Sequence, residues 1–182
     1  MTDSTDREQI PLRVGAAQWT VPGILRFARY QSGEIAIEIL TPEGEQQLVA
    51  TVALVPYGAP RPGEYGLWLK GWNENEGVPE ALVQAGVVTL TGRKHRTGHA
   101  EALHAELTEI GRAALVKGVE AERAQQATIV HREIDQLVQL NVLTAEKAKR
   151  VKQLLTPSVV DGHIAQGLGV HDIIDLHVKS LH

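Results

Sequence analysis

The chain has 182 residues, a hydrophobic content of 43%, a formal net charge of -4 and no cysteine. This length accommodates one sizeable domain or two small ones. The acidic balance argues against a protein that binds nucleic-acid backbones in bulk. The lack of cysteine excludes disulfides and thiolate metal sites. No apolar run approaches the roughly 20 residues that span a bilayer, so we expect a soluble, cytoplasmic protein with no membrane partner.

The N-terminal part of the chain is predicted to change from a polar tail to strands. Residues 1–27 are assigned to a tail and lead-in, because residues 1–10 lack the apolar segment of a signal peptide. Residues 34–40 alternate strictly and place three isoleucines on one face, which predicts a half-buried strand. After a proline–glycine turn at 41–44, the apolar segment 47–55 is predicted to return as a central strand.

A loop rich in proline and glycine at 56–63 precedes a third predicted strand at about 65–72. Strand alternation divides the larger side chains of this segment between two faces. One face carries Tyr65, Leu67 and Leu69, and the other carries Trp68, Lys70 and Trp72. Two indoles that flank a lysine are unusual on a face that contacts only water.

A short helix and two further strands complete the predicted fold of this region. Residues 73–77 end the third strand, and a helix is expected at about 78–85. Strands are expected at about 87–91 and 99–107. The sequence therefore predicts an α+β domain at 28–110, with mainly antiparallel strands, about five in number, and one packed helix.

The remaining residues, 111–182, show helical periodicity. A long helix is expected up to about residue 141, with apolar positions that recur at 3–4 spacing and form a seam for another helix. These positions are Ala127, Val130, Ile134 and Leu137. Thr144 is a suitable N-cap for the next helix. This region is predicted to be a small bundle or an oligomerisation region, and we expect a homo-oligomer that assembles through it.

The joint between the third strand and the short helix is dense in amide and carboxylate groups, and two interpretations remain open. Asn73 or Asn75 could cap the helix, while Glu74 and Glu76 favour the positive end of its dipole. Capping leaves the second asparagine and the outward indoles unexplained. Alternatively, these side chains bind a ligand or a partner beside the tryptophans.

A basic run, Arg93-Lys94-His95-Arg96, is the only tight cluster of cationic side chains. In an antiparallel sheet it could lie near the open end of the tryptophan strand. Arginine holds a phosphate with two parallel hydrogen bonds, and indole stacks on a nucleobase. The run therefore suits a nucleotide-like anion, or else it is a solvated hairpin tip.

Catalytic and metal-binding patterns are weak in this sequence. His95 and His99 have the spacing of helical metal ligands, but Gly98 breaks helicity between them. Glu74 and Glu76 could supply acid–base chemistry, yet no nucleophile, triad partner or phosphate loop accompanies them. We expect no catalytic residue, no metal and no cofactor.

Four stretches of the chain carry a resemblance to known proteins: residues 30–37, 69–77, 80–88 and 91–93. The pattern resembles a family of small phage- and plasmid-borne proteins, in which a Ser-Glu-Asn-Glu-Gly-like motif precedes an Ala-Leu-Val segment. The resemblance covers about residues 28–108. This chain has Asn73 in place of the serine, and its helical extension is not associated with that family.

Small phage proteins of this kind often counter host defence, and the Thoeris anti-defence sponge proteins sequester cyclic nucleotide signals in pockets made by oligomers. The resemblance thus implies a non-catalytic, oligomeric protein of a mobile element that sequesters a nucleotide-like signal in the host cytoplasm. We expect the ligand to contact Tyr65, Trp68, Lys70, Trp72, Asn73, Asn75, Glu76, Arg93 and His95. One alternative is an inhibitor or accessory factor that contacts a host protein through Trp68 and Trp72. The other is a hydrolase that uses Glu74 and Glu76.

Overall fold

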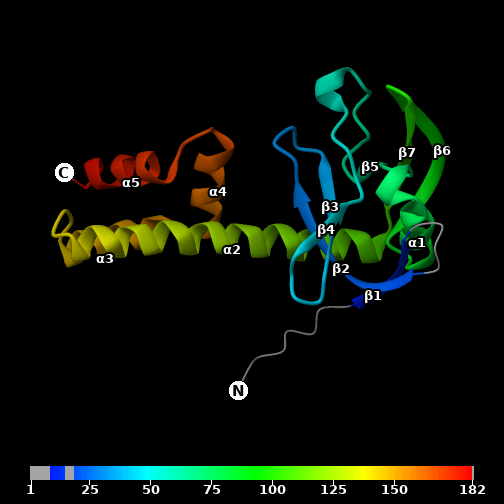
Figure 1. The fold of residues 1–182 in the computed structure, drawn as a ribbon. Coiled ribbons are helices and arrows are strands. Elements are labelled where there is room, and N and C mark those ends of the chain that lie inside the picture. Colours follow the sequence, from blue (N-terminus) through cyan, green and yellow to red (C-terminus); the bar gives the residue numbers. More distant parts are fainter. Residues whose placement is uncertain (1–8, 15–18, 182) are drawn as a thin grey trace. The chain divides into compact units, whose positions relative to one another are not determined.

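The computed structural model describes residues 9–14 and 19–181. Figure 1 shows the elements in chain order. The chain divides into two compact units, residues 1–119 and residues 120–182, which we call the αβ unit and the helical unit. Within the described residues, no helix is both long and apolar enough to cross a membrane.

The αβ unit contains two antiparallel sheets rather than the single sheet of about five strands that the sequence predicts. The first has the order β1 (Gln9–Val14), β2 (Trp19–Arg29), β3 (Ile35–Leu40), β4 (Gln46–Val49). The second has the order β5 (Gly66–Leu69), β7 (Ala100–Leu107), β6 (Val88–Thr97). The α+β class is confirmed, and the number and grouping of the strands are corrected.

The predicted tail is partly wrong, because β1 and most of β2 lie within residues 1–27. Each of these strands contains a proline, and Pro11 lies opposite Pro22 in their register. Proline removes a donor from the ladder and normally argues against a strand, so these paired strands are difficult to predict from the sequence. The first eight residues of the predicted tail lie outside the described part.

The predicted return strand at 47–55 is divided between the two sheets. β4 pairs with β3, and the Ala50 amide still donates to the Ile37 carbonyl oxygen. Residues 50–52 also pair with β5 through an isolated bridge and two flanking backbone hydrogen bonds. The third predicted strand, at 65–72, is shorter than expected and ends at Leu69. β6 is longer than expected and includes the whole basic run.

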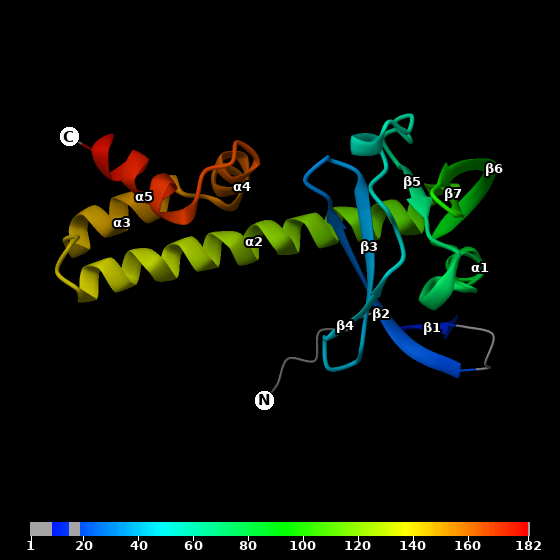
Figure 2. The ribbon, with the colours of Figure 1, turned by 45° about the horizontal axis from the view of Figure 1, so that its top comes forward.

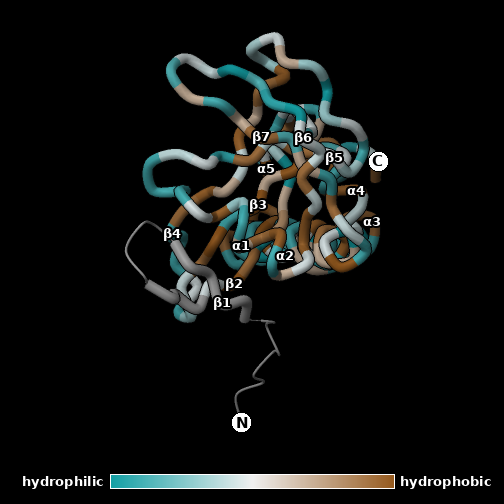
Figure 3. The backbone as a smooth tube through the Cα atoms, turned by 90° about the vertical axis from the view of Figure 1, so that its right-hand side faces the viewer, coloured by the Kyte–Doolittle hydropathy of each residue, from teal (hydrophilic) through white to brown (hydrophobic). Residues whose placement is uncertain are grey.

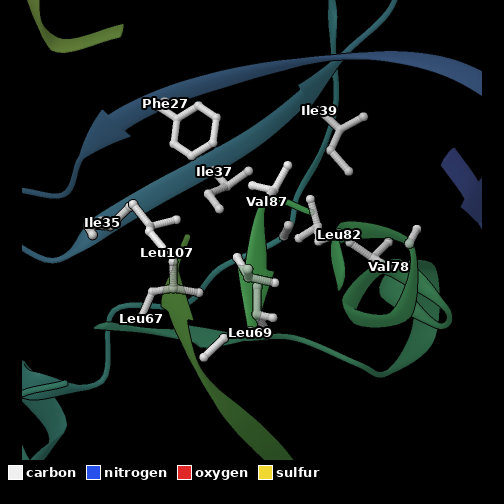
Figure 4. Close-up of a cluster of buried hydrophobic side chains, with 14 of the residues drawn as sticks. Phe27, Ile35, Ile37, Ile39, Leu67, Leu69, Val78, Leu82, Val87 and Leu107 are labelled. Carbon is white, nitrogen blue, oxygen red and sulfur yellow. The ribbon is translucent and has the colours of Figure 1, made fainter. Parts of the chain in front are cut away.

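The core of the αβ unit lies between the two sheets and α1 (Val78–Gln84). The isoleucines of β3 are fully buried, as their alternation predicts. Side chains from β2 and β3 meet those of β5, β7 and α1 (Figure 4). Figures 1 and 2 show β5, β6, β7 and α1 on the same side of β3. β3 is largely hydrophobic along its length, and the projecting hairpin loops are mostly hydrophilic (Figure 3).

The ends of α1 are set by glycines. Gly77 is the N-cap at φ 81°, and no side chain caps this helix. The capping interpretation is therefore wrong for both Asn73 and Asn75. Pro79 lies in the first turn, and Gly86 follows the C-cap at φ 70°, as expected.

The helical unit combines the second part of α2 (Glu109–Gln139) with α3 (Ala145–Leu154), α4 (Pro157–Ala165) and α5 (Val170–Lys179). Thr144 caps α3 by accepting a hydrogen bond from the Lys147 amide, which confirms the predicted N-cap. The α2 seam is buried against α3, α4 and α5 of the same chain. Intramolecular packing therefore accounts for the periodicity that predicted an oligomer.

The boundary between the units lies nine residues later than the predicted boundary at 110, because the first turns of α2 belong to the αβ core. Leu115 is buried there, and Val119 packs against the same cluster. Gly118 approaches the β2 backbone so closely that an added Cβ would lie 2.3 Å from the Phe27 carbonyl oxygen. Helix and sheet are therefore in direct contact up to the end of this unit.

Candidate functional site

The Trp68 side chain is buried, with only 3% of its surface exposed. Its face of β5 is opposite that of the neighbouring leucines, as predicted, but it does not face solvent. It packs in a separate cluster with Leu54, Ala59 and Ala102, which we call the Trp68 cluster. The expected outward tryptophan face is therefore corrected, because residues from the 54–62 segment cover it.

His104 lies at the centre of the site and was not predicted. It pairs with Trp68 in the β5–β7 register and is 1% exposed. The two rings form an edge contact with centroids 5.0 Å apart, and the His95 ring lies 5.6 Å from the indole. Alternation along β7 would have placed His104 on this face, but one histidine in a strand carries no specific signal without its neighbours.

Both ring nitrogens of His104 have polar partners. Nδ1 lies 2.8 Å from the Thr91 hydroxyl, and Nε2 lies 3.0 Å from the Pro62 carbonyl oxygen. The Arg93 guanidinium also contacts Nε2. Burial lowers the pKa of His104, and the Arg93 charge lowers it further, whereas the Pro62 carbonyl and Glu106 oppose this. Burial and the Arg93 charge therefore favour the neutral imidazole.

A β-bulge positions the partners of His104. Between two paired positions of β6 and β7, residues 91–93 of β6 lie opposite His104 alone. Gly92 within the bulge has φ 80°, a conformation that favours glycine. The bulge interrupts the ladder and turns Thr91 and Arg93 toward the imidazole.

Strand alternation divides the basic run between the two faces of the sheet. Lys94 and Arg96 pair with residues on the core face of β7, and the Lys94 ammonium forms a 3.0 Å ion pair with Glu101. His95 lies on the Trp68 face and Arg93 contacts His104. Arg93 has no carboxylate partner among the residues that the structure describes.

The joint after β5 forms a short 3-10 helix, η2 (Asn73–Asn75). Trp72 is half-buried against the Trp68 cluster. Asn73 is exposed and adopts a left-handed conformation at φ 53°. Asn75 is fully buried, and its amide donates to a Glu74 carboxylate oxygen at 3.2 Å. Glu76 is exposed.

Two buried polar atoms at this site have no hydrogen-bond partner in the part of the chain that the structure describes: Nε1 of Trp68 and Oδ1 of Asn75. An unsatisfied buried donor or acceptor costs about 1–3 kcal/mol. Lys70, two residues after Trp68, is half-buried. Burial lowers the pKa of its ammonium group, and the charge of Glu74 opposes this effect. These groups give the joint a polar, partly desolvated character.

Tyr65 is not part of this site. Its ring packs against the αβ core, and the Arg112 guanidinium lies 4.3 Å from its centroid. The structure brings Trp68 and Arg93 to His104. His95 contacts Trp68, and Trp72 packs at the edge of the Trp68 cluster. Tyr65 lies on the face opposite Trp68, as strand alternation predicts, and is therefore separate from these residues.

Acidification is expected to destabilise the αβ unit through His104. The unfolded chain takes up a proton near the ordinary histidine pKa of about 6.5, whereas the folded chain takes it up only at lower pH. The stability associated with neutral His104 is thus complete above that value and is lost as the pH falls through the lower, folded pKa. Urea unfolding followed by tryptophan fluorescence at about pH 7.5 and about pH 5.5 measures this loss.

His104→Gln provides the control for this pH dependence. The variant keeps the other histidines, so its unfolding free energy should change less between the two pH values than that of the wild type. Equal changes in the two proteins would assign the pH dependence to other groups.

Similarity to known proteins does not add to this description. No protein-family model, curated protein or solved structure matches this chain. The chemistry of the residues around His104 is therefore the basis for a functional proposal.

Proposed function

We propose that the αβ unit is a non-catalytic binding module for an anionic, nucleotide-like ligand. The observation that carries this proposal is the position of Arg93, which contacts the His104 imidazole and lacks a carboxylate partner in the described chain. A guanidinium without a carboxylate partner can donate two parallel hydrogen bonds to a phosphate.

Trp72 supplies the second element of the proposed site. Its indole is half-buried against the Trp68 cluster, so part of its surface stays open to a planar group. Stacking of a base on an aromatic side chain contributes about 1–3 kcal/mol and tolerates different bases. Trp68 supports this face from within and does not itself stack on the ligand.

The environment of the Glu74 and Glu76 carboxylates favours binding without turnover over hydrolysis. Glu74 and Glu76 are both exposed, and Glu74 already accepts a hydrogen bond from Asn75. A general base is usually held in a partly desolvated site within reach of its substrate. In the mobile-element setting that the resemblance implies, such a module would sequester a nucleotide signal of host defence.

A second candidate function is contact with a host protein. Tyr57 of η1 (Val55–Tyr57) is 82% exposed, and tyrosine and tryptophan are enriched among residues that dominate protein interfaces. Self-association through the helical unit is a separate possibility, and exposed apolar side chains outside the buried α2 seam favour it. Leu140 and Val142, beside the α2–α3 turn, are 71% and 70% exposed.

Arg93→Ala tests the ligand proposal, with Arg96→Ala as a matched control on the core side of the same strand. Titration calorimetry with a panel of cyclic and linear nucleotides should detect a ligand for the wild type. Loss of charged hydrogen bonds should weaken its affinity about ten- to hundredfold in Arg93→Ala. Arg96→Ala should stay within about twofold of the wild type.

Three outcomes would contradict this proposal. Failure of every nucleotide to bind folded wild-type protein would remove the ligand class. Equal effects of the two arginine variants would remove the site. Chemical change of the bound nucleotide, abolished in Glu74→Gln or Glu76→Gln, would favour the hydrolase instead.

A further inference from the structure

Residues 59–62 form a short segment, here called the flap, that covers the Trp68 side chain. Ala59 packs in the Trp68 cluster, and Pro62 is buried beside His104. The flap belongs to the loop that follows η1, drawn in cyan beside β5 in Figures 1 and 2. Two glycines with positive φ bound it: Gly58 at 87° and Gly63 at 100°.

The flap makes few hydrogen bonds along most of its length. An added Cβ at either bounding glycine would meet no atom within 4 Å, so both lie in open space. Within the described chain, residues 60–63 make no backbone–backbone hydrogen bond. Among the described residues, their one hydrogen-bonding contact is that of the Pro62 carbonyl, 3.0 Å from Nε2 of His104. Two prolines stiffen the flap between flexible ends.

Nε2 of His104 faces two partners that it cannot satisfy together. The Pro62 carbonyl only accepts hydrogen bonds, and the Arg93 guanidinium only donates them. A neutral imidazole carries either a hydrogen or a lone pair at this nitrogen. One tautomer therefore binds Pro62, and the other binds Arg93.

Thr91 can serve both tautomers of His104. Its hydroxyl donates to Nδ1 when Nε2 carries the hydrogen. When Nδ1 carries the hydrogen instead, Thr91 Oγ1 accepts it and can donate to the His104 carbonyl oxygen, 3.3 Å away. The two arrangements differ mainly in whether Nε2 binds the flap or the arginine.

We infer that His104 couples Arg93 to the flap, so that an anion which engages Arg93 frees Nε2 to hold the flap closed over Trp68. This coupling rests on the proposed function only for the nature of the anion, because the competition at Nε2 involves only residues of this chain. It assigns His104 a positioning role: ligand binding would tighten the cover of the cluster that supports Trp72.

The coupling can be measured by NMR without any ligand. Imidazole 15N shifts report the His104 tautomer, with the signal assigned by its absence in His104→Gln. Exchange of the Trp68 indole hydrogen reports opening of the flap, because Nε1 is buried without a partner. Arg93→Ala should shift His104 to the Nε2–H tautomer and slow this exchange about fivefold, the change expected for one hydrogen bond.

Arg96→Ala removes an equal charge from the other face and should change neither signal. An unchanged tautomer in Arg93→Ala would overturn the inference, and so would a changed tautomer with unchanged indole exchange. Because no nucleotide is present, a failed calorimetric titration leaves this result standing. Conversely, if the wild type binds a nucleotide but Arg93→Ala shows no NMR change, the coupling is contradicted while the proposed binding function stands.

Discussion

Replacing Trp68 with alanine is expected to lower the free energy of unfolding of the αβ unit by about 3–5 kcal/mol. The indole is 3% exposed, packs with Leu54, Ala59 and Ala102, and contacts the rings of two histidines. Its removal would leave a cavity under the flap that the prolines cannot readily fill. Urea unfolding followed by circular dichroism measures the loss. If the two units unfold in separate transitions, each transition is fitted by itself.

Trp72→Ala is the matched control for this prediction. Trp72 is half-buried at the edge of the same cluster, so we expect roughly half the loss of stability. Its main effect should instead be on ligand affinity. Equal losses for the two variants, or a small loss for Trp68→Ala, would show that the Trp68 cluster does not stabilise the unit as its packing indicates.

Gly66→Ala is expected to destabilise the αβ unit by about 3 kcal/mol. A Cβ at this position would lie 1.9 Å from the Pro62 carbonyl oxygen and 3.0 Å from Nε2 of His104. The nearest obstacle is backbone, so no side-chain rotation can relieve the contact. The flap would have to move away from His104, with loss of the Pro62 hydrogen bond. Urea unfolding of the purified variant provides the measurement.

Gly71→Ala separates this steric effect from the general effect of replacing glycine. Its added Cβ would make ordinary contacts, the nearest at 3.5 Å to Pro79 Cγ. We expect a change within about 0.5 kcal/mol, and alanine can stabilise by restricting the unfolded chain. A comparable loss in both glycine variants would argue against the close approach of Pro62 to β5.

Several local features of this fold could be predicted from neighbouring residues alone. The alternating isoleucines of β3 face the core, and Pro79 and Gly86 lie at the two ends of α1 as expected. Thr144 caps α3 through its own hydroxyl. Each of these outcomes depends on periodicity or on backbone preference within a few residues, which the order of residues expresses directly.

Other features depended on which distant segments meet. β1 and β2 pair although each contains a proline, which disfavours a strand. Residues 50–52 continue from the first sheet to pair with β5. The seam of α2 indicated a helix partner correctly, but periodicity does not distinguish a partner in the same chain from one in another. Here α3, α4 and α5 fill it.

The tryptophan face shows this division most clearly. Alternation by itself determined that Trp68 lies opposite Leu67 and Leu69, because successive side chains of a strand point to opposite sides. Only the tertiary structure decided that the 54–62 segment covers Trp68 and that a bulge turns Arg93 toward His104. Local geometry selects a face of the sheet, whereas burial of that face depends on chain brought from elsewhere in the sequence.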